Sequence, residues 1–289
     1  MKSIKAIAAI SLSTYLCSCQ PKPLEIEVAQ SPELLTISAA TTDPKSVFVS
    51  ASYSFNSLLS LNDPTKSDME IPENMLLKDA VVTLSGAQID TLKPMLPGLY
   101  GRQDLSLEDG RNYTLTVYDQ AKGKTVTAST RFHVAPAVAS IVPVVNRKKD
   151  DTTINLSIKM TAVAEEDYYF ISYHSSVSAR GLDRSPQAIA ASLASFSPKQ
   201  LTLLTGKEWT QANMEQHIPL TCKDSDTLLV HIGKIDQDYY EYLSTYKKCG
   251  YFINQMTGEP INLPTNILHG LGFFALAQPA KYVFKLQEF

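Results

Sequence analysis

The sequence predicts a mainly β protein: an N-terminal immunoglobulin-like β-sandwich followed by a β-rich α+β domain with a few short helices. In the first part, apolar and polar residues alternate over short segments, as they do in strands that bury one face. Turn-forming pairs such as Asp43-Pro44 and Asp109-Gly110 separate these segments. In the second part, alternating segments share the chain with stretches that begin on helix-capping residues.

The strands predicted for the first part follow one another at short intervals. They cover residues 34–38, 47–53, 80–84, 113–118 and 125–132. A long segment, residues 56–78, separates the second strand from the third, and loops of this length are often functional. Short strands with almost no helical periodicity between them predict a sandwich of immunoglobulin-like size.

The second part mixes strands with helices. Strands are predicted over residues 140–145, 153–160, 168–173, 227–232, 271–276 and 282–286. Ser185-Pro186 and Ser197-Pro198 each place a hydroxyl side chain before proline, which is a frequent start of a helix. Asp236 is predicted to cap a further helix that runs to about Tyr246.

The first residues have the pattern of an export signal. Lys2 and Lys5 precede an apolar run, residues 6–16, that is too short to span a bilayer as a stable helix. A small residue stands directly before Cys19 and a leucine three places before it, whereas Cys17 has no branched apolar residue three places back. We therefore expect cleavage before Cys19 and a membrane anchor through lipid on its thiol.

These patterns divide the chain into four parts. Residues 1–18 are the lipoprotein signal peptide and residues 19–32 are an extended tether. Residues 33–135 form the immunoglobulin-like sandwich, and residues 136–289 form the β-rich C-terminal domain. Because no later stretch approaches the roughly 20 apolar residues that cross a bilayer, the processed chain is expected to be anchored to a membrane without crossing it.

Charge and cysteine content narrow the expected chemistry. A formal net charge of −3 argues against nucleic acid as a partner, since proteins that bind it carry basic surfaces. Of the four cysteines, Cys222 and Cys249 would remain as thiols after processing. In an oxidising compartment these two are either joined in a disulfide or are two buried free thiols, and both alternatives stay open.

No residue pattern specifies a reaction, a metal or a cofactor. The histidines lack metal-site spacing such as H-E-x-x-H; they are His133, His174, His217, His231 and His269. The chain contains no G-x-S-x-G elbow, phosphate-binding loop or dinucleotide fingerprint. We therefore predict no catalytic residues, no metal and no cofactor, and keep an envelope hydrolase only as a remote alternative.

Four of the 14 tyrosines lie in the predicted helix that follows Asp236. They are Tyr239, Tyr240, Tyr242 and Tyr246. Three of them, Tyr239, Tyr242 and Tyr246, have helical spacing and share one face, which is usually the face that packs on a core. Exposed tyrosines would instead suit a contact with carbohydrate or protein, so the four are also a candidate binding face.

Seven segments downstream of Cys19 carry a family resemblance. They are residues 34–38, 79–84, 97–100, 110–115, 127–130, 236–243 and 264–274. The last of these, PTNILHGLGFF, is the most specific. In these segments the chain resembles a Bacteroidota outer-membrane lipoprotein family of the domain-of-unknown-function 4249 type, often encoded beside TonB-dependent receptors. The chain departs from that family at His269, where glycine is usual, and at Asp167, where asparagine is usual.

The resemblance implies an outer-membrane lipoprotein that acts without catalysis, as an accessory or binding component of a TonB-dependent transport or surface complex. Its expected partners are membrane lipid, through Cys19, and a TonB-dependent outer-membrane barrel, while its ligand is left open. The alternative is a surface lipoprotein that binds a ligand, or adheres, by itself. The periplasmic and surface faces of the outer membrane are both kept as locations.

Overall fold

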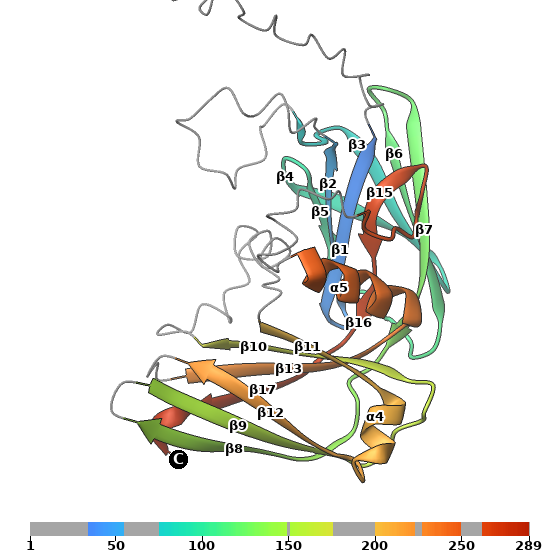
Figure 1. The fold of residues 1–289 in the computed structure, drawn as a ribbon. Coiled ribbons are helices and arrows are strands. Elements are labelled where there is room, and N and C mark those ends of the chain that lie inside the picture. Colours follow the sequence, from blue (N-terminus) through green and yellow to red (C-terminus); the bar gives the residue numbers. More distant parts are fainter. Residues whose placement is uncertain are drawn as a thin grey trace, which may run out of the picture. The chain divides into compact units, whose positions relative to one another are not determined.

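The structure is a computed structural model that describes residues 34–54, 75–148, 151–175, 200–222, 227–249 and 262–288. The predicted signal peptide and tether, with Cys19, lie outside these ranges. Most of the long segment and the helix starts at Ser185 and Ser197 also lie outside them. The described chain is mainly β with a few short helices (Figure 1), so the predicted fold class is confirmed.

Seven strands from the first part of the chain build a β-sandwich. They are β1 (Leu35–Asp43), β2 (Ser46–Tyr53), β3 (Ala80–Ser85), β4 (Ile89–Leu96), β5 (Leu99–Arg102), β6 (Asn112–Asp119) and β7 (Lys124–His133). Neighbouring strands pair in the order β7-β6-β3-β4-β5-β2-β1. Alternation decides which side chains enter the core, because Tyr113, Leu115 and Val117 of β6 are buried while the residues between them are not.

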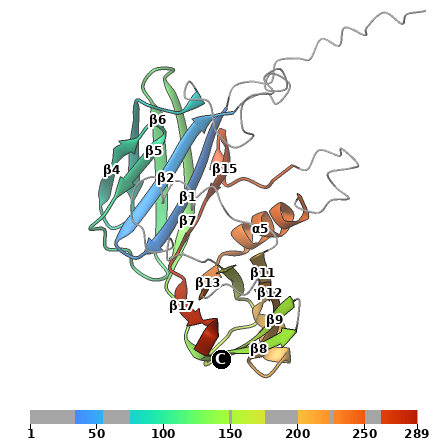
Figure 2. The same ribbon diagram turned by 90° about the vertical axis from the view of Figure 1, so that its left-hand side faces the viewer.

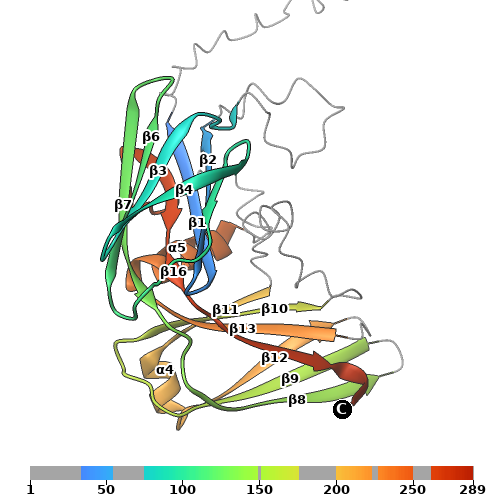
Figure 3. The same ribbon diagram turned by 180° about the vertical axis from the view of Figure 1, so that it is seen from behind.

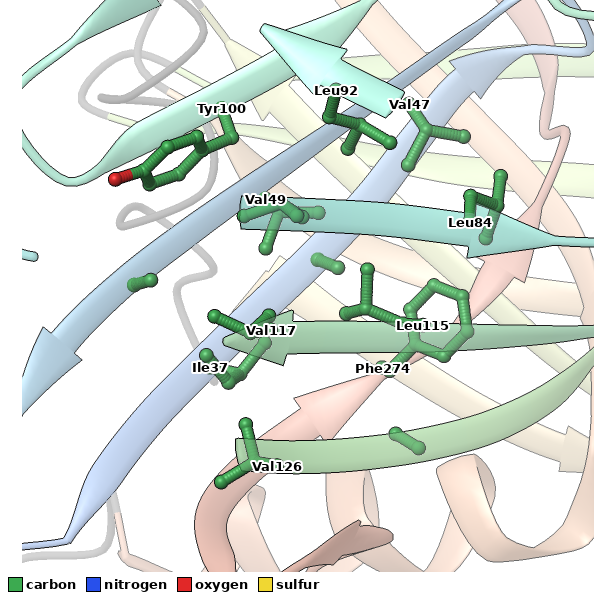
Figure 4. Close-up of a cluster of buried hydrophobic side chains, with 14 of the residues drawn as sticks. Ile37, Val47, Val49, Leu84, Leu92, Tyr100, Leu115, Val117, Val126 and Phe274 are labelled. Carbon is green, nitrogen blue, oxygen red and sulfur yellow. The ribbon is translucent and has the colours of Figure 1, made fainter. Parts of the chain in front are cut away.

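Strand β4 connects the two layers of the sandwich. Its first half, from Ile89 to Leu92, pairs with β3, and its second half, from Lys93 to Leu96, pairs with β5. Figure 2 shows β1, β2 and β5 side by side, and Figure 3 shows β3, β6 and β7 from behind. Apolar side chains of both layers meet between them, including Ile37 and Val117 (Figure 4), and their burial stabilises the sandwich.

Three short strands from near the end of the chain complete the sandwich. They are β14 (Ile267–Leu268), β15 (Gly270–Phe274) and β16 (Leu276–Ala277). Strand β15 pairs in parallel with β1, while β14 and β16 both pair with β7. Phe274 is fully buried in the sandwich core. The domain boundary at residue 135 stays a prediction, but the hydrogen-bonded sheet of the sandwich includes residues far beyond it.

The PTNILHGLGFF segment holds these returning strands in place. The side-chain Oδ1 of Asn266 accepts from the backbone N of Phe274 at 2.9 Å, and its Nδ2 donates to the backbone O of Phe274 at 2.8 Å. Gly272 lies opposite Ile37 with φ +98°, and a Cβ there would stand 1.9 Å from the Ile37 carbonyl oxygen. The specific residues of the segment therefore serve a close approach of backbone to backbone.

His269 carries strain that glycine would not. Its φ is +64°, in the left-handed region that costs a residue with a Cβ roughly 1 kcal/mol. We expect His269→Gly to raise the free energy of unfolding by about 0.5–1 kcal/mol in urea titrations. His269→Ala is the matched control and should bring no such gain, because alanine keeps the Cβ. Equal stabilisation by both substitutions would show that strain is not the cause.

The second part of the chain forms two further sheets. Their strands are β8 (Val138–Lys148), β9 (Asp151–Met160), β10 (Tyr168–Ser175), β11 (Leu201–Thr205), β12 (Glu215–Cys222), β13 (Thr227–Ile235) and β17 (Ala280–Lys285). One sheet has the order β11-β10-β13-β17 and the other β12-β9-β8. A second apolar core includes residues of both sheets: Leu156 of β9 from one, and Ile171 of β10 and Val230 of β13 from the other.

In the described part of the chain, three short helices accompany these sheets: α4 (Gly206–Gln211), α5 (Gln237–Cys249) and the 3₁₀ helix η4 (Leu286–Glu288). Sequence reasoning missed α4. The helix begins with a capping box, in which the side chains of Thr205 and Glu208 each accept from the backbone N–H of the other, and the spacing of these two residues is present in the sequence. The α4 residue Trp209 is fully buried in the second core. The helix predicted after Asp236 is confirmed as α5.

Candidate functional site

An open cavity of about 640 Å³, lined by both polar and apolar residues, lies where β7 leaves the sandwich. Its walls come from Asp109 and Gly110 before β6, from the end of β7 with residues 134–137, from residues 162–169 before and within β10, and from β13. The lining includes six residues with charged, imidazole or phenolic side chains: Asp109, Arg131, His133, Asp167, Tyr169 and Lys234. Ligand sites commonly combine such a concave shape with a few convergent polar groups.

Asp167 is the centre of one hydrogen-bonded group in this cavity. Lys234 Nζ lies 2.7 Å from Asp167 Oδ1, and the Tyr169 hydroxyl donates to Asp167 Oδ2 at 3.0 Å. Burial disfavours the carboxylate, but the bonds from Lys234 and Tyr169 outweigh it, so the pKa of Asp167 lies below its ordinary value. Burial and the Asp167 charge raise the pKa of Tyr169, so its hydroxyl stays a donor at neutral pH.

Asp236 is the centre of a second group, which includes His133 and Arg131 of the cavity lining. Its carboxylate accepts from His133 Nε2 at 2.8 Å, from the backbone N of Arg131 at 3.2 Å and from the Thr130 hydroxyl at 3.3 Å. Burial opposes the negative charge, yet the His133 bond and the Arg131 backbone bond outweigh it and hold the pKa of Asp236 below its usual range. Because the ionised carboxylate can only accept, His133 Nε2 is the donor.

This finding corrects the predicted role of Asp236. The residue stands directly before α5, as expected, and its backbone oxygen accepts from the backbone N of Tyr240 at 3.0 Å. Its carboxylate, however, binds β7 instead of serving as the cap that sequence reasoning assigned to it. The physical reason is that three donors of β7 lie together. The Thr130 hydroxyl and the Arg131 backbone N bond one oxygen of the Asp236 carboxylate, and His133 bonds the other.

The two groups give the cavity a fixed charge pattern. Asp167 and Asp236 are each held by several donors, and the Asp109 carboxylate accepts from the backbone N of Val134 at 3.0 Å. Arg131 is exposed at the rim, within electrostatic reach of Asp236. Side chains whose hydrogen bonds are already arranged can position a ligand at little entropic cost. The arrangement suits recognition of a small polar group by hydrogen bonds.

The tyrosines of α5 pack within the chain. Tyr239 and Tyr242 stack with ring centroids 6.0 Å apart, and their rings lie 5.1 and 4.9 Å from Phe273 of β15. Tyr246 continues the row, with its ring 6.3 Å from Tyr242. Tyr240 turns to the other side, where its ring lies 5.0 Å from Tyr168. The aromatic rows attach α5 to β15 and β10, and a role as a binding face stays a prediction.

The cysteine and metal predictions have different standing. Cys222 ends β12 and Cys249 ends α5, but their side chains lie outside the described residues, and the disulfide stays a prediction. Within the described ranges, no group of three His, Cys, Asp or Glu residues is placed to hold a metal ion. Among the helices of those ranges, none has the length and apolar character needed to cross a membrane.

Two histidines lie together on β10 and β13. The rings of His174 and His231 are 6.5 Å apart. Burial, together with the charges of Lys281 and His174, lowers the pKa of His231 to about 4, and burial lowers the pKa of His174. Histidines in the unfolded chain have pKa values near 6.5. Between about pH 4 and pH 6.5 the unfolded chain therefore binds more protons than the folded chain.

The free energy of unfolding is expected to decrease as the pH falls from about 6.5 to about 4. His231 should account for roughly 2 kcal/mol of this loss after solvent screening. His231→Gln should flatten this part of the pH profile in urea titrations. His217→Gln, whose side chain is 61% exposed in the native chain, should leave the profile unchanged. A profile that His231→Gln does not alter would contradict this assignment.

Local sequence reasoning did not find the two hydrogen-bonded groups of the cavity. Asp167 and Lys234 meet because β10 pairs with β13, and His133 and Asp236 meet across more than a hundred residues of chain. No spacing signal could have joined them. The family resemblance marked Asp167 only as a departure from the usual asparagine.

A family model described as Domain of unknown function (DUF4249) matches residues 21–282. No curated protein matches the sequence.

Two solved structures are similar in part. The first is the central fibronectin-III array of RIM-binding protein, with 9% identity over 70% of this chain and a TM-score of 0.19. The second comprises the three N-terminal domains of the bacteriophage RB49 highly immunogenic outer capsid protein, with 10% identity over 70% of this chain and a TM-score of 0.22. The chain spans 62% and 54% of the lengths of these two structures.

Proposed function

Since the chain belongs to the family described as Domain of unknown function (DUF4249), its role has to be argued from its own residues, and we propose a non-enzymatic binding role at the outer membrane. The protein is a lipid-anchored accessory component of a TonB-dependent transport or surface complex. The anchor is Cys19, which stands two residues before the family match begins. The mainly β body binds the partner or its cargo.

The cavity beside β7 is the observation that carries the binding role. Two of its lining residues are already engaged, Asp167 by Lys234 and Tyr169 and His133 by Asp236, so they present a fixed surface of charge and hydrogen-bonding groups. Proton transfer would require one of these groups to change its protonation state, and the low pKa of Asp167 opposes this near neutral pH. A preorganised polar surface favours binding.

The test is a pull-down of the tagged, lipidated protein from its native outer membrane in mild detergent, followed by mass spectrometry. We expect a TonB-dependent barrel in stoichiometric amount. Arg131→Gln, at the cavity rim, should lower recovery of the barrel by about tenfold or more if the cavity is the contact. Lys159→Gln, an exposed residue of β9, is the matched control and should leave recovery unchanged. Recovery of the protein without any outer-membrane protein would overturn the proposal.

A surface lipoprotein that binds a ligand by itself is the second candidate. The exposed Arg131 at the cavity rim favours it, because a guanidinium can hold a carboxylate or phosphate by two parallel hydrogen bonds. In that case the protein would be recovered alone from the membrane. A library of small anionic ligands should then raise its melting temperature, and Arg131→Gln should abolish the shift.

A further inference from the structure

The β14–β15 turn carries apolar side chains that the sandwich leaves in solvent. Leu268 is 59% exposed and Leu271 is 39% exposed, while Leu263, a few residues earlier, is 38% exposed. Single exposed leucines are ordinary on protein surfaces, but three within nine residues beside one turn form a local concentration. Ile267, Phe273 and Phe274 of the same segment are buried, so the turn projects its leucines from a firmly held base.

This turn lies at the end of the sandwich where the described chain begins. Strands β1 and β15 are parallel, with Leu35 opposite Gly270, so both start at the same end (Figure 1). A Cβ added to Gly270 would stand 2.7 Å from the Leu35 carbonyl oxygen, which shows how closely the turn approaches the start of β1. The leucines of the turn are therefore neighbours of the first described residues, Leu34 and Leu35.

The length of chain before Leu34 sets the distance to the proposed lipid anchor. Residues 20–33 connect Cys19 to Leu34, and a chain of that length spans at most about 50 Å. The anchor therefore confines this end of the sandwich to within about 50 Å of the membrane, and every other part of the described chain is joined to the anchor through it. A weak apolar contact at this end would act at a high effective concentration.

Charge at the same end also suits a lipid surface. The β6–β7 hairpin lies beside the turn, since Leu268 pairs with Thr127 near the start of β7. The hairpin exposes Lys122 and Lys124, and Lys122 Nζ lies 3.7 Å from the centroid of the Tyr53 ring. Lysines beside apolar side chains are attracted to anionic headgroups while the apolar side chains enter the interface.

We propose that the β14–β15 turn docks on the lipid surface to which the chain is anchored, with Leu268 and Leu271 entering the boundary between headgroups and acyl chains. The inference rests on the proposed lipid anchor. Docking would hold the sandwich at a defined orientation to the membrane, since the anchor and the turn are two separate points of attachment.

Quenching by brominated lipid tests this contact on the full, lipidated chain. The protein is reconstituted in phosphatidylcholine–phosphatidylglycerol vesicles whose acyl chains carry bromine. In Leu268→Trp, the added indole should lose fluorescence roughly twofold relative to vesicles without bromine, because bromine quenches only at short range in the interface. The native Trp209 is fully buried and contributes a constant background fluorescence, which is measured on the wild-type protein.

Ile89→Trp is the matched control. Ile89 is 74% exposed and pairs with Ser85 at one end of β3. The other end of β3, at Ala80, pairs with Asp119 beside the β6–β7 hairpin, so Ile89 lies far from that hairpin. Its fluorescence should be equal in brominated and ordinary vesicles. Leu271→Trp is a second reporter and should be quenched like Leu268→Trp. Equal quenching of all three variants, or of none, overturns the docking proposal.

The failure of the anchor and the failure of docking have different signatures. If the wild-type protein does not float with vesicles and its Cys19 carries no lipid by mass spectrometry, the anchor is wrong. If the protein floats and Cys19 is lipidated, but Leu268→Trp is not quenched, only docking is wrong. Protection of Leu268→Trp from bromine by a co-purified membrane protein would instead assign the turn to a protein partner.

Discussion

Gly272→Ala is expected to prevent the sandwich from closing. The added Cβ would stand 1.9 Å from the carbonyl oxygen of Ile37, at a position whose φ is already +98°. Neither backbone can move away without breaking the parallel pairing of β1 with β15. We expect a loss of more than about 4 kcal/mol in the free energy of unfolding, seen as a loss of soluble folded protein or a large drop in the urea midpoint.

Gly123→Ala separates backbone strain from steric conflict. Gly123 also has a positive φ, +63°, but an added Cβ there meets nothing within 4 Å. Its substitution should cost only about 1–2 kcal/mol, the strain of the left-handed conformation alone. If both variants unfold at the same urea concentration, the close approach of Gly272 to Ile37 does not govern the stability of the sandwich.

Asn266→Ala is expected to cost about 3 kcal/mol, because it removes two short bonds and leaves the backbone groups of Phe274 without their partner. A third, longer bond joins Asn266 Nδ2 to the Ser129 carbonyl oxygen at 3.4 Å. The asparagine therefore ties β15 to the start of β14 and to β7. Urea titration followed by circular dichroism measures the effect, and hydrogen exchange at the Phe274 amide should quicken before global unfolding.

Asn155→Ala supplies the control for this asparagine. Asn155 is exposed on β9, in the second part of the chain. Its substitution should change the free energy of unfolding by less than about 0.5 kcal/mol. An Asn266→Ala protein that is as stable as Asn155→Ala would mean that the PTNILHGLGFF segment owes its specific sequence to something other than this clamp.

The segments that sequence reasoning assigned best are those with strong local patterns. The alternation from Tyr113 to Tyr118 predicted β6, and the residues around Asp236 predicted the start of α5. The local pattern is sufficient there because the spacing of apolar residues along the chain shows which side chains are buried. It was insufficient at α4, a helix of six residues that offers little periodicity and whose capping box at Thr205 and Glu208 was overlooked.

The candidate site depended on contacts that no local pattern contains. Asp236 was placed at the start of its helix from sequence, but the partners of its carboxylate, His133 and Arg131, come from β7. Lys234 drew no attention in the sequence, because a lysine in a strand is usually an exposed residue. Only the pairing of β10 with β13 brought it to Asp167.

The sequence by itself determined the mainly β class, most strand positions, the helix α5 and the expectation of a lipid anchor at Cys19. These follow from neighbours in the chain, where side-chain period, turn chemistry and short motifs act. The tertiary structure alone decided that residues 267–277 complete the first sandwich and that the cavity forms beside β7. Both depend on pairing between residues far apart in the chain, which is set by the packing of whole strands and has no signature in adjacent residues.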